Sequence, residues 1–427
     1  MSNSSTTETD IPETGLTKTR DEGLVEATGE ATAEEPVEEP VEEPAMFKDY
    51  MLPDGVLRAI DDLGFEYCTP IQGATFPFSL SDFDVTGQAQ TGTGKTAAFL
   101  ITILTQQFEH PLQVPNAPGT PRALIIAPTR ELVLQIESDA QELGKYTDSN
   151  TMCVVGGIDF QKQKDRLESE SIDILVATPG RLLDFARRRI LDLGKVEILV
   201  IDESDRMLDM GFIPDVRRIV HMTPHKRKRQ TLFFSATFND EVMNLAAQWT
   251  IDPHHVVISP ENVVTDTVDQ RFWAVSSDEK NTILLKILQQ GVHSRILIFA
   301  NRRDQTRYVS SFLTSNGIHN AVLSGEVPQK KRISTLDNFK SGKTRVLVAT
   351  DVAGRGIHVD DISHVINYDL PEEAEDYVHR IGRTGRAGTS GIAISFISED
   401  DAFNIPAIEE YLGHAIRSQH PEFIEQP

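Results

Sequence analysis

The chain has 427 residues, 39% hydrophobic and 25% charged, which is enough for about two domains with ordinary buried cores. Two cysteines, Cys68 and Cys153, cannot form a disulfide framework, and no run of about 18 apolar residues predicts a membrane span. The first ten residues lack the basic and apolar regions of a signal peptide, so we expect a cytoplasmic protein with no membrane contact. The net charge of −24 argues weakly against nucleic-acid binding, although a cationic channel can lie within an acidic surface.

Residues 1–45 are predicted to form a disordered acidic tail. They contain 13 Asp/Glu, two Lys/Arg and no aromatic residue, and the near-repeat EEPVEEPVEEP covers positions 34–44. Proline interrupts helices, and neighbouring acidic pairs repel each other, so this segment favours an extended chain. A solvating tail is the favoured interpretation, and a partner-binding segment is the alternative.

From Met46 onward, short apolar runs alternate with helical patterns. A stretch rich in Pro, Asn and Asp near residues 252–267 separates two such sets and is typical of a linker. The expected fold is α/β with two tandem parallel-sheet domains, over 46–252 and 268–413, a linker over 253–267 and a C-terminal tail over 414–427. Buried parallel strands are expected at 123–128, 174–179, 197–202, 231–237, 295–300, 319–325, 344–351, 364–370 and 391–397.

A nucleotide-binding loop is predicted at AQTGTGKT, between the short strand DVTG and a helical run. Its glycines allow backbone N–H groups to surround phosphate oxygens, Lys95 reaches the β- and γ-phosphates, and the Thr96 hydroxyl binds Mg²⁺. The flanking strand and helix disfavour the alternative of a chance Gly-rich turn. The residues expected to bind ATP here are Ala89, Gln90, Thr91, Gly92, Thr93, Gly94, Lys95 and Thr96.

Acidic and basic catalytic candidates occur in two further motifs. In DESD, Asp202 is expected to orient Mg²⁺ through its water shell, and Glu203 to position or deprotonate the attacking water. Acidic residues after a strand are also common as simple caps, but the nucleotide-binding loop favours the catalytic role. In HRIGRTGR, Arg383 and Arg386 are expected to neutralise the γ-phosphate transition state from the second domain. A solvated basic turn is the alternative.

Ten short motifs in this order resemble those of the DEAD-box ATP-dependent RNA helicases. They are GFEYCTPIQ (64–72), AQTGTGKT, PTREL (128–132), GG (156–157), TPGR (178–181), DESD, SAT (235–237), QKKR (329–332), ATDVAGRGI (349–357) and HRIGRTGR. The resemblance covers residues 46–413, and CTPIQ, SGEVPQKKR and NIPAIEEYLGHAI most resemble the bacterial RhlB type. It implies two RecA-like domains, ATP and Mg²⁺ as cofactors, and an RNA-stimulated ATPase that binds RNA independently of sequence.

The resemblance also assigns roles to single residues. Gln72 is implied to read the adenine edge, with Phe47 and Phe65 around the base, although without the resemblance both aromatic residues would more often be core residues. Ser235 and Thr237 are implied to couple the nucleotide and RNA sites. The implied RNA contacts are Thr129, Arg130, Gly156, Gly157, Thr178, Arg181, Gln329, Arg332 and Thr350.

Several residues depart from the family pattern. Ser204 replaces the usual Ala, Cys68 a usual Pro, and Gly354 a usual Ala, changes from which we expect little loss of catalysis. His358 replaces an Asp implied to touch the ribose, so nucleotide affinity or coupling is in question. The basic runs 187–189 and 226–229 are either solvated helix ends or additional RNA contacts.

The expected mechanism is closure of the two domains around ATP and RNA, which unpairs a short duplex or remodels a ribonucleoprotein. The RhlB resemblance also implies a role in RNA degradation and a partnership with an RNA-degrading endonuclease assembly. Two alternatives remain open: an ATP-gated RNA clamp or scaffold with slow turnover, and a DNA-directed translocase. Slow turnover with long RNA retention would favour the clamp, and equal stimulation by DNA would favour the translocase.

Overall fold

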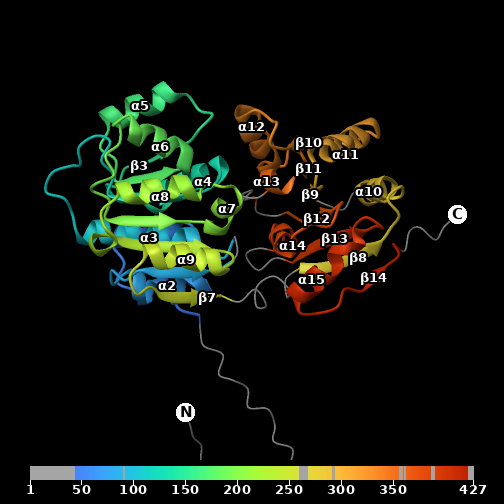
Figure 1. Ribbon diagram of the computed structural model, residues 1–427, viewed down its shortest axis with the longest axis horizontal. Coiled ribbons are helices and arrows are strands. Elements are labelled where there is room, and N and C mark those ends of the chain that lie inside the picture. The colour runs from blue at the N-terminus through green and yellow to red at the C-terminus, as the bar shows by residue number, and fades with distance from the viewer. Residues whose placement is uncertain are drawn as a thin grey trace, which may run out of the picture. The chain divides into compact units, whose positions relative to one another are not determined.

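The computed structural model describes residues 44–89, 92–258, 268–290, 294–354, 359, 362–385 and 390–421. They contain two seven-stranded sheets in which every strand pair is parallel, as predicted (Figure 1). The strand orders are β3-β4-β2-β5-β6-β1-β7 and β10-β11-β9-β12-β13-β8-β14. The acidic tail expected over residues 1–45 lies almost wholly outside the described residues. No helix in the described part of the chain is both long and apolar enough to cross a membrane.

The central strands β2, β4 and β5 of the first sheet are buried on both faces, as expected for wholly apolar parallel strands. In β2, Leu124 and Ile126 face one core, and Ile125 faces the other. Helices α1–α4 cover the face of Ile125, and α5–α9 cover the face of Leu124. The strands are β1 Val85–Gln88, β2 Ala123–Ile126, β3 Thr151–Val154, β4 Ile174–Ala177, β5 Ile198–Ile201, β6 Gln230–Ser235 and β7 His254–Val257. The helices are η1 Phe47–Asp49, α1 Asp54–Asp62, α2 Pro70–Ser79, α3 Lys95–Glu109, α4 Arg130–Leu143, α5 Phe160–Ser169, α6 Pro179–Arg187, α7 Ser204–Asp209, α8 Ile213–Met222, η2 Lys226–Lys228 and α9 Asp240–Trp249.

Strand β7 lies within the segment expected to be a linker. It pairs with β1 in the register Val85↔His254 and forms the edge of the first sheet. The ring of His254 stacks on Phe78 of α2 with a centroid distance of 3.8 Å. The first sheet therefore extends to Val257, and residues 259–267 lie outside the described residues.

The second sheet repeats the same parallel plan. Its strands are β8 Val268–Ala274, β9 Ile296–Phe299, β10 Asn320–Leu323, β11 Val346–Ala349, β12 His364–Asn367, β13 Gly391–Ile397 and β14 Ser418–Gln419. Its helices are α10 Lys280–Gln289, α11 Arg303–Ser315, α12 Gln329–Lys340, α13 Asp351–Gly354, α14 Ala374–Ile381, η4 Ala402–Asn404 and α15 Ile405–Leu412. Strand β14 falls in the segment expected to be a C-terminal tail, where it pairs with β8.

A buried arginine stabilises the second domain. Arg380 is 2% exposed and donates two hydrogen bonds, of 2.5 and 2.6 Å, to the carboxylate of Asp351. It also donates to Asn301 Oδ1 at 2.6 Å. A bidentate arginine–carboxylate pair fixes both partners in position. The pair therefore holds α14, which precedes Arg383, against α13.

Candidate nucleotide and RNA sites

The predicted nucleotide-binding loop connects β1 to α3. Gly92 and Gly94 have φ values of 90° and 94°, in the left-handed region that favours glycine. A Cβ at Gly94 would lie 2.5 Å from Gln72 Nε2, so only glycine fits at this position. Lys95 is buried and donates to the Ala89 carbonyl at 2.6 Å. The helix starts at Lys95, and its positive N-terminal end therefore points at the loop.

Of the other predicted loop residues, the structure describes Thr93 and Thr96. Thr93 and Thr96 are half-buried, with Thr96 in the first turn of α3. Gln90 and Thr91 lie outside the described residues. The described part of the loop has the backbone form of an anion-binding turn at a helix N-terminus.

Gln72 links α2 to this loop. It is 4% exposed, accepts a hydrogen bond from the Thr69 backbone N–H at 2.9 Å, and donates one to the Gly94 carbonyl at 3.1 Å. The bond from the Thr69 N–H to Gln72 is the one that a glutamine makes in a capping box, at the start of α2. The Gln72 amide has one further hydrogen and a second lone pair, so it can still bind a base edge.

The two predicted aromatic contacts lie in different environments. Phe47 is 3% exposed and packs against Phe76 with a centroid distance of 6.2 Å, which makes it part of the core. Phe65 is 46% exposed. Phe47 is therefore a core residue, as the alternative interpretation proposed, whereas Phe65 is not.

Asp202 follows β5 and is 2% exposed. Burial raises the pKa of its carboxyl to about 6, although the positive charge of Lys95 opposes this shift. The described residues contain no group of three or more His, Cys, Asp or Glu side chains that could hold a metal ion by themselves. One buried carboxylate and the Thr96 hydroxyl nevertheless fit Mg²⁺, which takes one or two carboxylates and otherwise water and substrate phosphates.

Glu203 has a left-handed backbone conformation, with φ of 52° and ψ of 53°. Such a conformation is strained for a residue other than glycine, and strain of this kind is common at functional sites. The Glu203 carboxylate accepts a hydrogen bond from the buried Arg206 guanidinium. The turn therefore sets the direction of the Glu203 side chain, and Arg206 fixes it there.

Asp205 connects the DESD segment with Ser235–Thr237. Its Oδ2 accepts hydrogen bonds from the backbone N–H groups of Ala236 and Thr237, at 3.0 and 3.1 Å. In return, the Asp205 N–H donates to Ser235 Oγ at 3.2 Å. Both predicted coupling residues are therefore bound to Asp205. Sequence analysis assigned Asp205 no role, although its place in the tetrad was a signal.

The predicted arginines of the second domain follow α14. Arg383 is 3% exposed and donates from Nε to the His379 carbonyl at 3.1 Å. Arg386 lies outside the described residues. Arg383 lies about one turn after Arg380. The pairing of Arg380 with Asp351 fixes the C-terminal end of α14, from which Arg383 follows.

Most of the predicted RNA contacts line one cavity of about 540 Å³. These are Thr129, Arg130, Gly156, Thr178, Arg181, Gln329 and Arg332. Gly157 is next to this lining, and its backbone lies against Arg130. Thr350 is not part of the lining, and its backbone bonds to Leu323 and Gly354.

The glycine pair makes room for Arg130. A Cβ at Gly156 would lie 3.2 Å from Arg130 Nη2, and a Cβ at Gly157 would meet the same guanidinium. Gly157 also has a φ of 77°. Arg130 donates to Gln329 Oε1 at 3.1 Å. Glycine is therefore favoured at both positions because a side chain would collide with Arg130, and at Gly157 also because of the backbone conformation.

Glu131 is a residue of this cavity that sequence analysis missed. Its Oε1 accepts from Arg332 Nε at 2.8 Å and from Gln329 Nε2 at 3.1 Å. The side chains of the ion pair are 9% and 12% exposed. Glu131 thus holds two predicted RNA-binding residues in place, and its position in PTREL was the available signal.

Asp184 lines the cavity from the middle of α6 and pairs with Arg188 at 2.8 Å, whereas other polar residues of the lining lie at helix starts. Thr129 caps α4 by accepting from the Leu132 N–H at 3.3 Å, and Thr178 precedes α6. Arg181 lies 5.4 Å from the ring centre of Phe160, and burial lowers the pKa of its guanidinium. Two helix N-termini and three arginines, Arg130, Arg181 and Arg332, therefore border the same space, which suits phosphate oxygens.

The chain is similar to known proteins over most of its length. The DEAD/DEAH box helicase family matches residues 69–245, and the helicase conserved C-terminal domain matches residues 279–388. The chain is 58% identical over 375 residues to the ATP-dependent RNA helicase RhlB of Pseudomonas aeruginosa, covering 88% of this chain and 94% of that protein. It is 46% identical over 372 residues to RhlB of Pasteurella multocida, covering 87% of each. Its fold is similar to S. cerevisiae Dbp5 bound to RNA and ADP BeF3, with a TM-score of 0.78, 32% identity, and coverage of 88% of this chain and 95% of that one.

Proposed function

The chain belongs to the DEAD-box family of ATP-dependent RNA helicases and to its RhlB type, and on this premise we propose that it couples ATP hydrolysis to the unpairing of short RNA duplexes. One observation carries the proposal: the carboxyl edge of the first sheet is divided between two kinds of site. The nucleotide motifs follow β1, β5 and β6, whereas the predicted RNA motifs follow β2, β3 and β4. The two groups of strands adjoin at the β2–β5 pair, so one sheet can transmit movement between the sites.

In the proposed nucleotide site, Lys95 neutralises phosphate oxygens, and Thr96 and Asp202 hold Mg²⁺. When bound, this ion adds positive charge against the phosphate groups. Glu203 orients a water molecule in line with the γ-phosphorus and accepts its proton as the bond to the leaving oxygen breaks. The burial of Asp202 and the fixed direction of Glu203 support these roles.

Arg383 and Arg386 complete the proposed hydrolysis site from the second domain when the domains close. The family resemblance and the fixed end of α14 support this assignment. RNA lies across the cavity of Arg130, Arg181 and Arg332, bound through sugar and phosphate without recognition of sequence. Closure bends the bound strand and unpairs it, and hydrolysis reopens the cavity.

We further propose a cytoplasmic role in RNA degradation, within an endonuclease assembly that the second domain contacts. The similarity to RhlB supports this proposal. A pull-down of the full chain with the endonuclease scaffold segment tests it. Equal recovery of the chain with and without that segment would contradict the proposed partnership.

The primary test is steady-state ATP hydrolysis without nucleic acid, with single-stranded RNA, and with DNA of the same sequence. Lys95→Ala controls for contaminating ATPases. We expect strong stimulation by RNA alone, and loss of all activity in the variant. Equal stimulation by DNA would contradict the RNA assignment, and slow turnover with long RNA retention would favour the clamp.

A further inference from the structure

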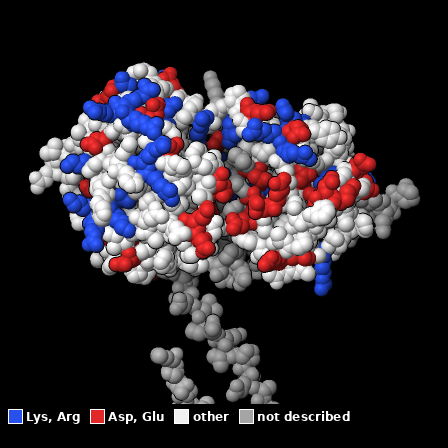
Figure 2. All heavy atoms as spheres, viewed as in Figure 1, with Lys and Arg blue, Asp and Glu red and all other residues white. Residues whose placement is uncertain are grey.

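Five basic side chains form an exposed surface on the first domain that the proposed function does not use. Arg187 and Arg189 lie at the end of α6, Arg217 lies on α8, and Arg227 and Lys228 lie in η2; together they are called the basic strip. Within the described part of the chain, none of the five has a carboxylate partner. Residues 213–229 contain six Lys/Arg and one Asp. Figure 2 shows basic side chains gathered over the α5, α6 and α8 face of the first sheet.

The basic strip is a continuation of the RNA cavity. Arg181 near the start of α6 and Phe212 just before α8 both line the cavity. The helices pack against each other and follow neighbouring crossovers of a parallel sheet, so both run away from the cavity in the same direction. At 1.5 Å per residue they are about 13–15 Å long. RNA that leaves the cavity along them reaches the basic strip within a few nucleotides.

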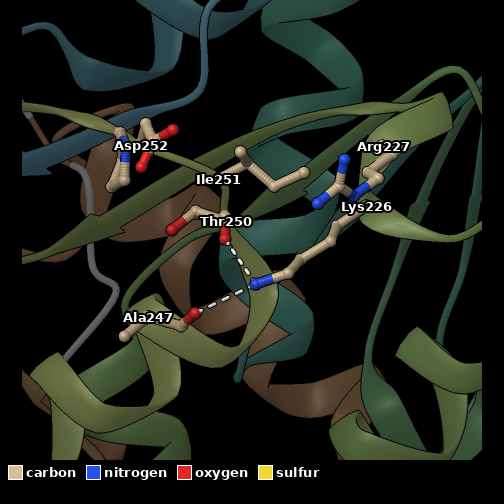
Figure 3. Close-up of a pocket in the computed structure, with 7 residues that line it drawn as sticks. Lys226, Arg227, Ala247, Thr250, Ile251 and Asp252 are labelled. Atoms are coloured by element: carbon tan, nitrogen blue, oxygen red, sulfur yellow. Dashed lines mark hydrogen bonds between the residues drawn. The ribbon is translucent and has the colours of Figure 1, made fainter.

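The KRKR segment is divided between structural and exposed side chains. Lys226 donates to the carbonyls of Ala247 and Thr250, at 3.2 and 2.7 Å, and so caps the end of α9 (Figure 3). Arg229 is buried and donates to Thr223 Oγ1 and to the Pro224 carbonyl. Arg227 and Lys228 are exposed. Packing therefore accounts for the two outer residues of the segment but not for the two inner ones.

Arg189 provides an independent observation. Its φ of 59° places it in the left-handed region at the end of α6, where glycine is the favoured residue. An arginine at this position is conformationally less favourable than glycine, because its Cβ crowds the backbone there. The side chain gains no ion pair in return within the described part of the chain. A binding role for its charge would explain why an arginine stands here.

We propose that the basic strip is a second RNA-binding surface that holds phosphates of the strand leaving the cavity. This inference rests on the proposed function, because it requires RNA in the cavity. Arg and Lys without exposed aromatic neighbours bind phosphates regardless of base sequence. An RNA strand is favoured over an acidic protein because the strip adjoins the cavity through α6 and α8.

The test compares two single-stranded RNAs, of about 8 and about 24 nucleotides, by fluorescence anisotropy with the full chain at several salt concentrations. The strip variant is Arg187→Ala/Arg189→Ala/Arg217→Ala. The control variant, Arg271→Ala/Arg307→Ala/Lys343→Ala, removes three exposed cations from the second domain. A third variant carries Lys at the three strip positions and keeps their charge.

We expect the strip variant to bind the long RNA at least about tenfold more weakly than the unaltered chain does. The slope of the logarithm of the binding constant against the logarithm of the salt concentration should become shallower by about two. The strip variant should bind the short RNA with the same affinity as the unaltered chain, and the Lys variant should bind the long RNA as tightly as the unaltered chain does. A loss no larger than that of the control would overturn the proposal and favour an acidic protein as the occupant. Absence of RNA binding by the unaltered chain would instead contradict the proposed function.

Discussion

Asp205 and Thr237 are joined through a single carboxylate oxygen. Oδ2 of Asp205 accepts from the Thr237 N–H at 3.1 Å and from its hydroxyl at 3.4 Å. The other oxygen, Oδ1, accepts from the Arg206 N–H at 2.9 Å. Both oxygens thus face backbone donors, and the turn after β5 must move together with the end of β6.

Asp205→Asn is expected to uncouple RNA binding from hydrolysis. Either orientation of the amide places its NH₂ group against a backbone N–H, so at least one hydrogen bond is lost. We expect the RNA-stimulated ATPase rate to fall about tenfold or more, the rate without RNA to fall less, and the free energy of unfolding to drop by about 1–3 kcal/mol. Steady-state kinetics and urea denaturation measure these changes. Equal losses with and without RNA would argue against a coupling role.

Ser204→Ala is the matched control in the same turn. The Ser204 hydroxyl is buried and has no hydrogen-bond partner among the described residues. Its removal should leave the RNA-stimulated rate within about twofold and raise stability by up to about 1 kcal/mol. A large loss of activity would show that the hydroxyl has a partner in the nucleotide-bound state.

Asp202→Asn is expected to abolish ATP hydrolysis while stabilising the fold at neutral pH. Burial raises the pKa of Asp202 from 3.8 to about 6, so the folded state binds its proton more tightly than the unfolded state does. Above pH 6 the buried Asp202 is charged and lowers the free energy of unfolding. This destabilisation disappears as the pH falls from 6 to below 4, because the carboxyl becomes protonated in both the folded and the unfolded state. We expect the variant to be more stable by about 1–3 kcal/mol at pH 7.5.

The check on Asp202 is chemical denaturation of both proteins at pH 7.5 and pH 4.5. The stability difference should shrink at the lower pH. A difference that grows on acidification would mean that the carboxylate is stabilised in the folded state.

Gly157→Ala is expected to weaken RNA binding about tenfold. The added methyl group would collide with the Arg130 guanidinium, and the φ of 77° is unfavourable for alanine. Gly180→Ala is the control in the same cavity, because its Cβ would meet nothing within 4 Å. Anisotropy with a short RNA measures both. Equal affinities of the two variants would refute the positioning of Arg130 by the glycine pair.

The Glu131–Arg332 pair is expected to contribute to RNA-stimulated hydrolysis through positioning. Glu131→Gln removes the charge opposite a largely buried guanidinium and should raise the RNA concentration for half-maximal stimulation about tenfold. A double-mutant cycle with Arg332→Lys isolates the interaction, for which we expect a coupling energy of about 1–3 kcal/mol. Additive effects of the two substitutions would indicate that the residues act separately.

Sequence patterns predicted both parallel sheets because most of their strands are continuous apolar runs that end at polar motifs. Strands β3, β7, β8 and β14 were not anticipated. TMCV and HHVV are short, and β7 follows a proline within an Asn/Asp-rich stretch that is typical of a linker. Edge strands bury less apolar surface than central strands. Whether such a segment forms a strand therefore depends more on its pairing in the folded protein than on its own sequence.

Motif order located the candidate sites, but contacts between side chains needed coordinates. Nothing in the sequence shows that Asp205 binds Thr237, or that Glu131 binds Arg332, because these partners are 32 and 201 residues apart. The division of KRKR into buried and exposed residues likewise depends on where the end of α9 lies. Spacing identifies residue types at motifs, whereas packing determines their partners.

Strand β14 has only two residues, yet it covers an otherwise open side of β8. Ser418 and Gln419 pair with Phe272 and Trp273, near the end of the strand sequence VDQRFWA. Without that cover, β8 would present an unpaired backbone beside two large aromatic rings, which is the arrangement that recruits further strands. A chain cut before Ser418 would therefore keep every motif of catalysis but self-associate at this edge and precipitate from solution.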